Sequence, residues 1–182
     1  MMIRIAITGP ESSGKTALSE YLASRIESAL LLPEYAREYL EAKPIGYEYS
    51  SDEVVHCAEV THQRIVEALS QRADVLICDT DFYVLDIWHR VVFGEKNQRI
   101  MELKQSHWFD LYYLCKPDIP WEYDPLRVDE HNRDELYALY EQHIKSDNNP
   151  YYVVQGNDEL RHARVLNHLL ERFPSLKVKE KS

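Results

Sequence analysis

The first residues of the chain constrain its fold more than any other segment. An apolar run from Ile3 to Thr8 predicts a strand, and it leads directly into Gly9-Pro10-Glu11-Ser12-Ser13-Gly14-Lys15-Thr16, which fits G-x-x-x-x-G-K-[ST]. Glycines let the backbone curl until successive amides converge on a phosphate group. Apolar residues at helical spacing follow. Strand, loop and helix in this order predict a nucleotide-phosphate site rather than a plain strand-turn-helix.

The side chains of this loop have expected roles. Lys15 would place its ammonium group against the β- and γ-phosphates, and Thr16 would offer a hydroxyl to Mg²⁺ at the start of a helix whose dipole favours anions. The loop residues that we expect to bind the nucleotide are Gly9, Glu11, Ser12, Ser13, Gly14, Lys15, Thr16 and Ala17.

The rest of the chain alternates between apolar runs and helical periodicity, which predicts an α/β fold with a doubly wound, parallel five-stranded sheet and helices on both faces. With 182 residues the chain suits one domain over residues 1–176, with a lid segment around 116–133 and a solvated tail at 177–182. Expected strands cover 3–8, 30–32, 75–78, 111–114 and 151–154; expected helices begin at Thr16 and cover 51–72, 82–93, 132–145 and 159–172, with helix-start signals at Ser51 and Asp158.

Charge and cysteine usage limit the classes of partner. The net charge of −10 argues against a broad nucleic-acid footprint, whereas a small phosphorylated ligand is compatible with it. The three cysteines are widely spaced, as in reduced core residues of a cytoplasmic protein. No stretch is apolar enough for a membrane span, so we expect no membrane association.

Polar residues directly after each strand are the next candidates, because ligands bind beyond the carboxyl ends of parallel strands. Glu34 follows the second strand and could hold or deprotonate a substrate hydroxyl, while Arg37 could bind the substrate or a phosphate. A surface helix bearing these two residues is an equal alternative. After the third strand, Asp79 or Asp81 could organise Mg²⁺, or either could cap the next helix.

The segment after the fourth strand contains prolines at 117, 120 and 125, which exclude a helix, and the arginines Arg127 and Arg133. It predicts a lid that closes over the transferring phosphates, with a stiff surface loop as the alternative. Four aromatic residues lie near strand ends in the sequence, and one or two of them could stack on a planar or cationic heterocycle: Tyr35, Tyr83, Trp88 and Trp121.

Five motifs occur in an order that resembles the ribosylnicotinamide kinase domain of NadR-type proteins, from residue 3 to about residue 172. They are Gly-Pro-Glu-Ser-Ser-Gly-Lys-Thr, Pro-Glu-Tyr-Ala-Arg-Glu-Tyr, Cys-Asp-Thr-Asp, Asp-Ile-Pro-Trp and Asp-Pro-x-Arg. The resemblance implies a three-layer P-loop NTPase fold with strand order 2-3-1-4-5. It also implies ATP with Mg²⁺ as donor and the 5′-hydroxyl of nicotinamide riboside as acceptor, giving nicotinamide mononucleotide.

The resemblance also implies roles for individual residues. Glu34 is the first choice for base or hydroxyl anchor, Asp79 joins Thr16 at the metal, and Asp81 is a competing base or ribose ligand. Gly156 and Arg161 follow the last strand, where such folds hold adenine. The resulting catalytic set is Lys15, Glu34, Asp79, Asp81, Arg127 and Arg133, and the acceptor-binding set is Glu34, Tyr35, Arg37, Asp81 and Trp88.

The sequence lacks two features of full NadR-type proteins, and other functions also fit its phosphate loop. Full NadR-type proteins also carry a nucleotidyltransferase domain with an H-x-G-H signature, and some carry a helix-turn-helix; this sequence has neither. A kinase for another nucleoside or a nucleoside monophosphate, or a P-loop ATPase or switch acting on a protein partner, also fits the loop. The sequence does not indicate an oligomeric state.

Overall fold

Five parallel strands form one sheet in the computed structural model, which describes residues 2–44, 46–121, 132–157 and 159–180. The strands are β1 (Ile3–Thr8), β2 (Ala29–Leu32), β3 (Val75–Asp79), β4 (Leu111–Cys115) and β5 (Tyr151–Val154), and the helices are α1 (Lys15–Arg25), α2 (Tyr35–Glu41), α3 (Ser51–Leu69), α4 (Phe82–Phe93), α5 (Gln98–Ser106), α6 (Arg133–Ser146) and α7 (Arg161–Arg172). The order β2-β3-β1-β4-β5 confirms the expected topology.

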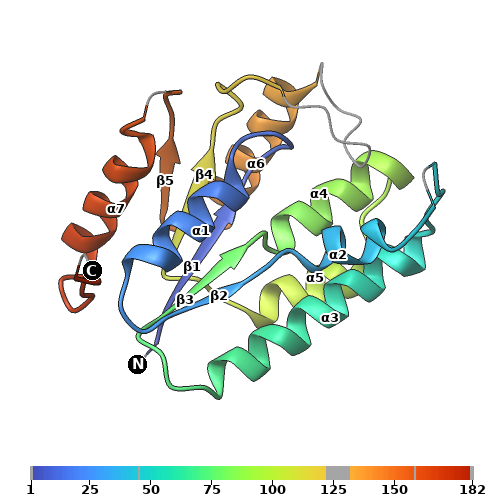
Figure 1. The fold of residues 1–182 in the computed structure, drawn as a ribbon. Helices are drawn as coiled ribbons and strands as arrows, with labels where there is room; N and C mark the ends of the chain where they lie inside the picture. Colours follow the sequence, from blue (N-terminus) through green and yellow to red (C-terminus); the bar gives the residue numbers. More distant parts are fainter. Residues whose placement is uncertain (1, 45, 122–131, 158, 181–182) are drawn as a thin grey trace.

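Alternate residues of each strand contact opposite helical layers, which makes the fold three layers thick (Figure 1). On β1, Ile5 and Ile7 pack with α1 and α7, whereas Ala6 packs with the layer formed by α3, α4, α5 and α6. Parallel strands covered on both faces must be apolar along their whole length. The central strands β3 and β4 are indeed buried at every residue.

Two helices differ from the expected elements. Helix α5 was not expected, because few of its residues are apolar: of its nine residues, only Ile100 and Leu103 are buried. The side chain of Asn97 starts this helix by accepting from the amides of Arg99 and Ile100. The segment after Glu34 is the helix α2, which the sequence had left as an alternative.

The starts of two further helices also differ from expectation. The N-cap of α3 is Ser50, not Ser51, and it forms a reciprocal capping box with Glu53. Helix α7 begins at Arg161, and the expected start signal Asp158 lies outside the described residues.

The end of the chain is held by its backbone. The amide of Glu27 donates to Lys177 O and the amide of Lys179 donates to Arg25 O, both at 2.8 Å, around a single antiparallel bridge between Ile26 and Val178. The side chains from Lys177 to Glu180 are exposed, as expected for a tail. This contact ties the segment to the turn between α1 and β2, so the described part of the tail is not free. Among the described helices, none is both long and apolar enough to cross a membrane.

The turn that leaves β1 passes very close to the end of β4. Gly9 has φ +135°, and a Cβ atom built there would lie 2.6 Å from the backbone oxygen of Cys115. Both the backbone angle and the contact exclude a side chain, because the neighbour is backbone and cannot swing away. Glycine is therefore required by packing as well as by phosphate chemistry.

We predict that Gly9→Ala lowers the free energy of unfolding by about 3 kcal/mol or more, because strain and a backbone clash add together. Gly94→Ala is the matched control: Gly94 has φ +74° with nothing within 4 Å of its added Cβ, so only the left-handed backbone cost of about 1 kcal/mol applies. Urea unfolding of both variants measures the difference. Equal losses would show that the approach to Cys115 does not matter.

Candidate active site

The phosphate loop joins β1 to α1 at the carboxyl edge of the sheet. Gly14 caps α1 in a left-handed conformation and carries no side chain, so the first amides of the helix are not capped by a side chain of that residue. The Lys15 ammonium group donates to the carbonyl oxygens of Gly9 at 3.0 Å and Pro10 at 2.9 Å, and the Ser13 hydroxyl donates to Pro10 O at 2.7 Å. Uncapped amides at a helix start beside a lysine suit an anion such as a phosphate.

Asp79 lies at the end of β3, beside the phosphate loop. Its side chain is buried, with a hydrogen bond from the Thr16 hydroxyl. Burial raises the pKa of Asp79 above its ordinary value, although the Thr16 hydrogen bond and the Lys15 charge oppose the shift. Among the described residues, its Oδ1 atom has no hydrogen-bond partner. A buried carboxylate oxygen left open beside a hydroxyl is a donor set that fits Mg²⁺.

Asp81 caps helix α4. Its Oδ1 atom accepts from the Thr8 hydroxyl at 2.9 Å and from the Val84 amide at 3.4 Å, and the residue is 1% exposed. Burial raises the pKa of Asp81 to about 6. The structure therefore places Asp81 in the capping position, which was the alternative to a ligand or base role.

Thr80, between the two aspartates, was missed by the sequence analysis. It is 6% exposed, its φ is +84°, and its Oγ1 atom has no hydrogen-bond partner among the described residues. A positive φ is unusual for a β-branched residue and is held only where the surroundings impose it. The residue type gives no signal for this conformation, so sequence alone could not have found it.

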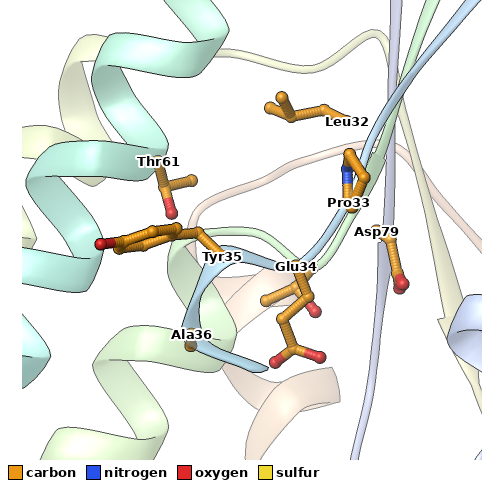
Figure 2. Close-up of a pocket in the computed structure, with 8 residues that line it drawn as sticks. Leu32, Pro33, Glu34, Tyr35, Ala36, Thr61 and Asp79 are labelled. Carbon is orange, nitrogen blue, oxygen red and sulfur yellow. The ribbon is translucent and has the colours of Figure 1, made fainter. Parts of the chain in front are cut away.

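A small cavity lies next to Asp79, where the ends of β2 and β3 meet (Figure 2). Leu32 pairs with Cys78 in the sheet, which places the residues after β2 beside those after β3. The residues that line the cavity are Leu32, Pro33, Glu34, Tyr35, Ala36, Thr61, Asp79 and Thr80. The structure thus brings together Glu34, Tyr35 and Asp79, three of the expected site residues.

The lining residues Glu34 and Tyr35 occupy different parts of this cavity. Glu34 is half-buried at the start of α2, and Figure 2 shows its carboxylate extending away from the Tyr35 ring. The Tyr35 ring lies beside Thr61 of α3, its hydroxyl is 3.2 Å from His56 Nε2, and the Arg64 guanidinium lies 4.5 Å from the ring centre. One aromatic face at the cavity is therefore already in contact with a cation.

The other expected acceptor residues are less directly placed. Arg37 lies on the helix α2 and forms an ion pair with Glu41 at 2.8 Å, and its charge also opposes the rise in the pKa of Asp79. Trp88 lies on α4 and donates to the Tyr49 hydroxyl at 2.8 Å, outside the set of residues that line the Glu34 cavity. Tyr83, also on α4, is buried and donates to Asp147, so it belongs to the core.

The expected lid and adenine residues also reach the phosphate loop. Arg133 starts α6 and donates to Ser12 O at 3.3 Å and to Ile119 O at 3.2 Å, and its guanidinium lies 5.5 Å from the Trp121 ring centre. Arg161 starts α7 and donates to Ser13 O at 2.9 Å and to Gly156 O at 2.7 Å. Arg127 lies outside the described residues.

Comparisons with known proteins identify a matching family and solved structures with the same fold. A family model described as an AAA domain matches residues 4–161. No curated protein matches the chain significantly.

Solved structures of NadR share the fold. A complex with NR has a TM-score of 0.77 at 19% identity, covering 100% of this chain and 53% of the NadR chain. A complex with NAD and AMP-PNP has a TM-score of 0.76 at 18% identity, covering 100% and 52%. This chain thus spans about half of the NadR chain.

Thymidylate kinase from Ehrlichia chaffeensis follows, with a TM-score of 0.65 at 16% identity over 92% of this chain and 98% of that one. The chain therefore has the fold of P-loop nucleoside and nucleotide kinases, and the resemblance to NadR-type domains is confirmed at the level of fold.

We predict that Asp81 makes folding stability depend on pH. Because burial raises its pKa from the ordinary value of 3.8 to about 6, the folded state holds its proton more tightly than the unfolded state. This contribution is fully present below about pH 4 and is lost as the pH rises through 6, up to about 3 kcal/mol.

Asp81→Asn keeps the Oδ1 acceptor and removes the titration, so its free energy of unfolding should fall less than that of the wild type between pH 4 and 7. Chemical denaturation at half-unit pH steps measures both curves, with Asp52→Asn as an exposed control on α3. Parallel curves for wild type and Asp81→Asn would contradict the prediction.

Proposed function

The chain belongs to the AAA domain family, and from that premise we propose that it is an ATP-dependent kinase that phosphorylates the 5′-hydroxyl of nicotinamide riboside, giving nicotinamide mononucleotide. One observation carries this proposal. The strands β2 and β3 end side by side, so that Glu34 lines the same cavity as Asp79, whose carboxylate accepts from Thr16 of the phosphate loop. The proposed donor and acceptor sites would therefore adjoin each other, one strand apart.

The donor half would act mainly through charge and position, as phosphoryl transfer requires. Lys15 would hold the β- and γ-phosphates, and Arg133, which already contacts Ser12 of the loop, would bring a second positive charge to the transferring group. Thr16 and Asp79 would hold Mg²⁺, which would supply positive charge against the transferring phosphates. Arg127 is proposed as a further lid arginine on the resemblance alone.

Glu34 is the better candidate for the group that orients or deprotonates the acceptor hydroxyl. It is half-buried and lines the cavity. Asp81 has a pKa near that of a useful base, but its carboxylate is almost fully buried and already caps α4. A base must reach the proton that it removes, which favours Glu34.

Three observations support nicotinamide riboside as the acceptor. The NadR structures cover the whole of this chain, and one of them holds NR. Nicotinamide riboside carries a cationic ring, which suits an acidic protein of net charge −10. Tyr35 at the cavity offers an aromatic face on which such a ring could stack. Trp88, on α4 and outside the residues that line this cavity, is proposed as a second stacking residue.

A cytoplasmic location is part of the same proposal. Cys57, Cys78 and Cys115 are free and buried, as expected in a reducing compartment. The partners that we propose are small molecules: ATP with Mg²⁺, and a nucleoside.

We predict that ADP release is stimulated by nicotinamide riboside and not by common nucleosides, their monophosphates or buffer alone. Lys15→Ala should lower this activity at least about 100-fold, because it removes the ammonium group from the transferring phosphates, and circular dichroism should show the fold intact. Lys177→Ala, an exposed lysine near the chain end, serves as the control.

Stimulation by a monophosphate alone would assign the chain to the nucleotide kinases that share its fold. Hydrolysis without an acceptor, together with a nucleotide-sensitive protein partner, would instead indicate an ATPase or switch.

We also predict different kinetic defects for the two carboxylates of the cavity. Glu34→Gln should lower kcat about 10²- to 10⁴-fold with little change in the KM for ATP, since it acts on the acceptor hydroxyl. Asp79→Asn should raise the Mg²⁺ concentration needed for half-maximal rate, since it removes a negative oxygen ligand. Rates measured across a Mg²⁺ titration separate the effects. A larger kcat loss in Asp81→Asn than in Glu34→Gln would reverse the choice of base.

A further inference from the structure

Three loops meet at the guanidinium group of Arg161. Its Nη1 atom donates to Asp118 Oδ1 at 2.6 Å and to Gly156 O at 2.7 Å, and its Nη2 atom donates to Ser13 O at 2.9 Å and to Lys116 O at 3.4 Å. These acceptors belong to the phosphate loop, the segment after β4 and the segment after β5, which gather at the upper edge of the sheet in Figure 1. We call this set of five residues the Arg161 junction.

Because the Arg161 side chain is buried, the arrangement of the junction depends on the groups that pair with its charge. The Arg161 side chain is only 6% exposed, so its charge needs a partner, and Asp118 supplies it. The second oxygen of Asp118 accepts from the Gly156 amide at 2.7 Å, which fixes the orientation of the carboxylate. A planar guanidinium can satisfy several acceptors in fixed directions, whereas a lysine cannot. The Asp-Ile-Pro-Trp motif thereby acquires a structural role for its first residue.

The junction also sets the direction of a peptide group in the phosphate loop. In a trans peptide the C=O and N–H bonds point in opposite directions. Since the Ser13 carbonyl points at Arg161, the following amide, that of Gly14, points away from Arg161. The Ser12 carbonyl is held in the same manner by Arg133, which turns the Ser13 amide. Two arginines therefore bind successive carbonyls and leave successive amides free to converge on an anion.

We propose that Arg161, held by Asp118, is a positioning residue that aims the Gly14 amide at the donor phosphates. The inference rests on the proposed use of ATP, and it replaces direct contact with adenine, the role that the resemblance implied for Arg161. Both terminal nitrogens of its guanidinium already donate to protein acceptors, which favours positioning.

The test compares ATP with inorganic tripolyphosphate, which carries the phosphates without the base. Titration calorimetry with Mg²⁺ would measure both dissociation constants for wild type, Arg161→Gln and Asp118→Asn. We expect each variant to raise the dissociation constants of both ligands by the same factor, about tenfold or more. The double variant should bind each ligand as tightly as the single variant that binds it less tightly, because the two substitutions disrupt the same junction. A loss for ATP with unchanged tripolyphosphate binding would assign Arg161 to adenine and overturn the proposal.

Arg164→Gln is the matched control. Arg164 lies on the same helix, is exposed, and donates to Gln155 O at 3.4 Å rather than to the phosphate loop. The substitution removes the same charge as Arg161→Gln but no bond of the junction, so it should leave both dissociation constants unchanged. Weakening by Arg164→Gln equal to that by Arg161→Gln would show that general charge, not positioning, sets the affinity.

A second measurement distinguishes a loss of positioning from a general loss of folding. Asp118 is about one-third exposed, so Asp118→Asn should remain folded, and amide hydrogen exchange can be compared within it. With saturating Mg²⁺ and ATP, whose phosphates would accept from these amides, the Ser13 and Gly14 amides should exchange at least about tenfold faster than in wild type, while amides of β1 and β3 keep their rates. Unchanged exchange at Ser13 and Gly14 would contradict positioning.

Neither binding nor exchange requires an acceptor. If nicotinamide riboside is not phosphorylated while the variants lose affinity for ATP and tripolyphosphate by the same factor, the proposed acceptor is wrong and the proposed role of Arg161 is supported. If nicotinamide riboside is phosphorylated and the variants lose affinity for ATP alone, only the proposed role of Arg161 is wrong.

Discussion

The close approach of the phosphate loop to the end of β4 is the constraint on which the site depends. Gly9 leaves β1 against the backbone of Cys115, with no room for a side chain. This contact places the segment after β4 over the phosphate loop, so that Ile119 lies against Gly14 and Arg133 and Arg161 can reach the loop carbonyls. The phosphate loop and the described part of the segment after β4 are thus held by one packing arrangement at the edge of the sheet.

Buried polar side chains gather at the carboxyl edge of the sheet. Most of the buried polar side chains in the described part of the chain lie there, and they include Thr8, Ser12, Ser13, Asp79, Thr80, Asp81 and Arg161. Burying such groups is unfavourable unless each finds a partner. Asp81 and Arg161 do so within the protein, whereas Asp79 Oδ1 and Thr80 Oγ1 are without one among the described residues. These two atoms lie beside the small cavity at the ends of β2 and β3, where the proposed donor and acceptor would meet.

Features that depend on local sequence could be predicted, and those that depend on distant contacts could not. The bounds of β1, α4 and β5 agree with the expected ranges, because clear apolar periods and sharp turn residues mark them. The phosphate loop was equally visible. Whether Asp81 would bind a ligand or cap a helix was left open, since both uses follow the same strand end. The positive φ of Thr80 left no local signal, because surrounding packing imposes it. Helix α5 was missed because few of its residues are apolar, although Asn97 before it is a residue type that caps helices.

The contact between Arg161 and Ser13 joins residues that are 148 positions apart. A ribosome therefore completes the whole G-x-x-x-x-G-K-T sequence long before it makes the side chain that binds the Ser13 carbonyl. A chain that ends before α7 would contain every residue of the phosphate motif and still lack one of the two arginines that orient its amides. In this protein the phosphate motif and one arginine that orients it lie 148 positions apart, so the geometry of the motif is completed only after α7 has been made.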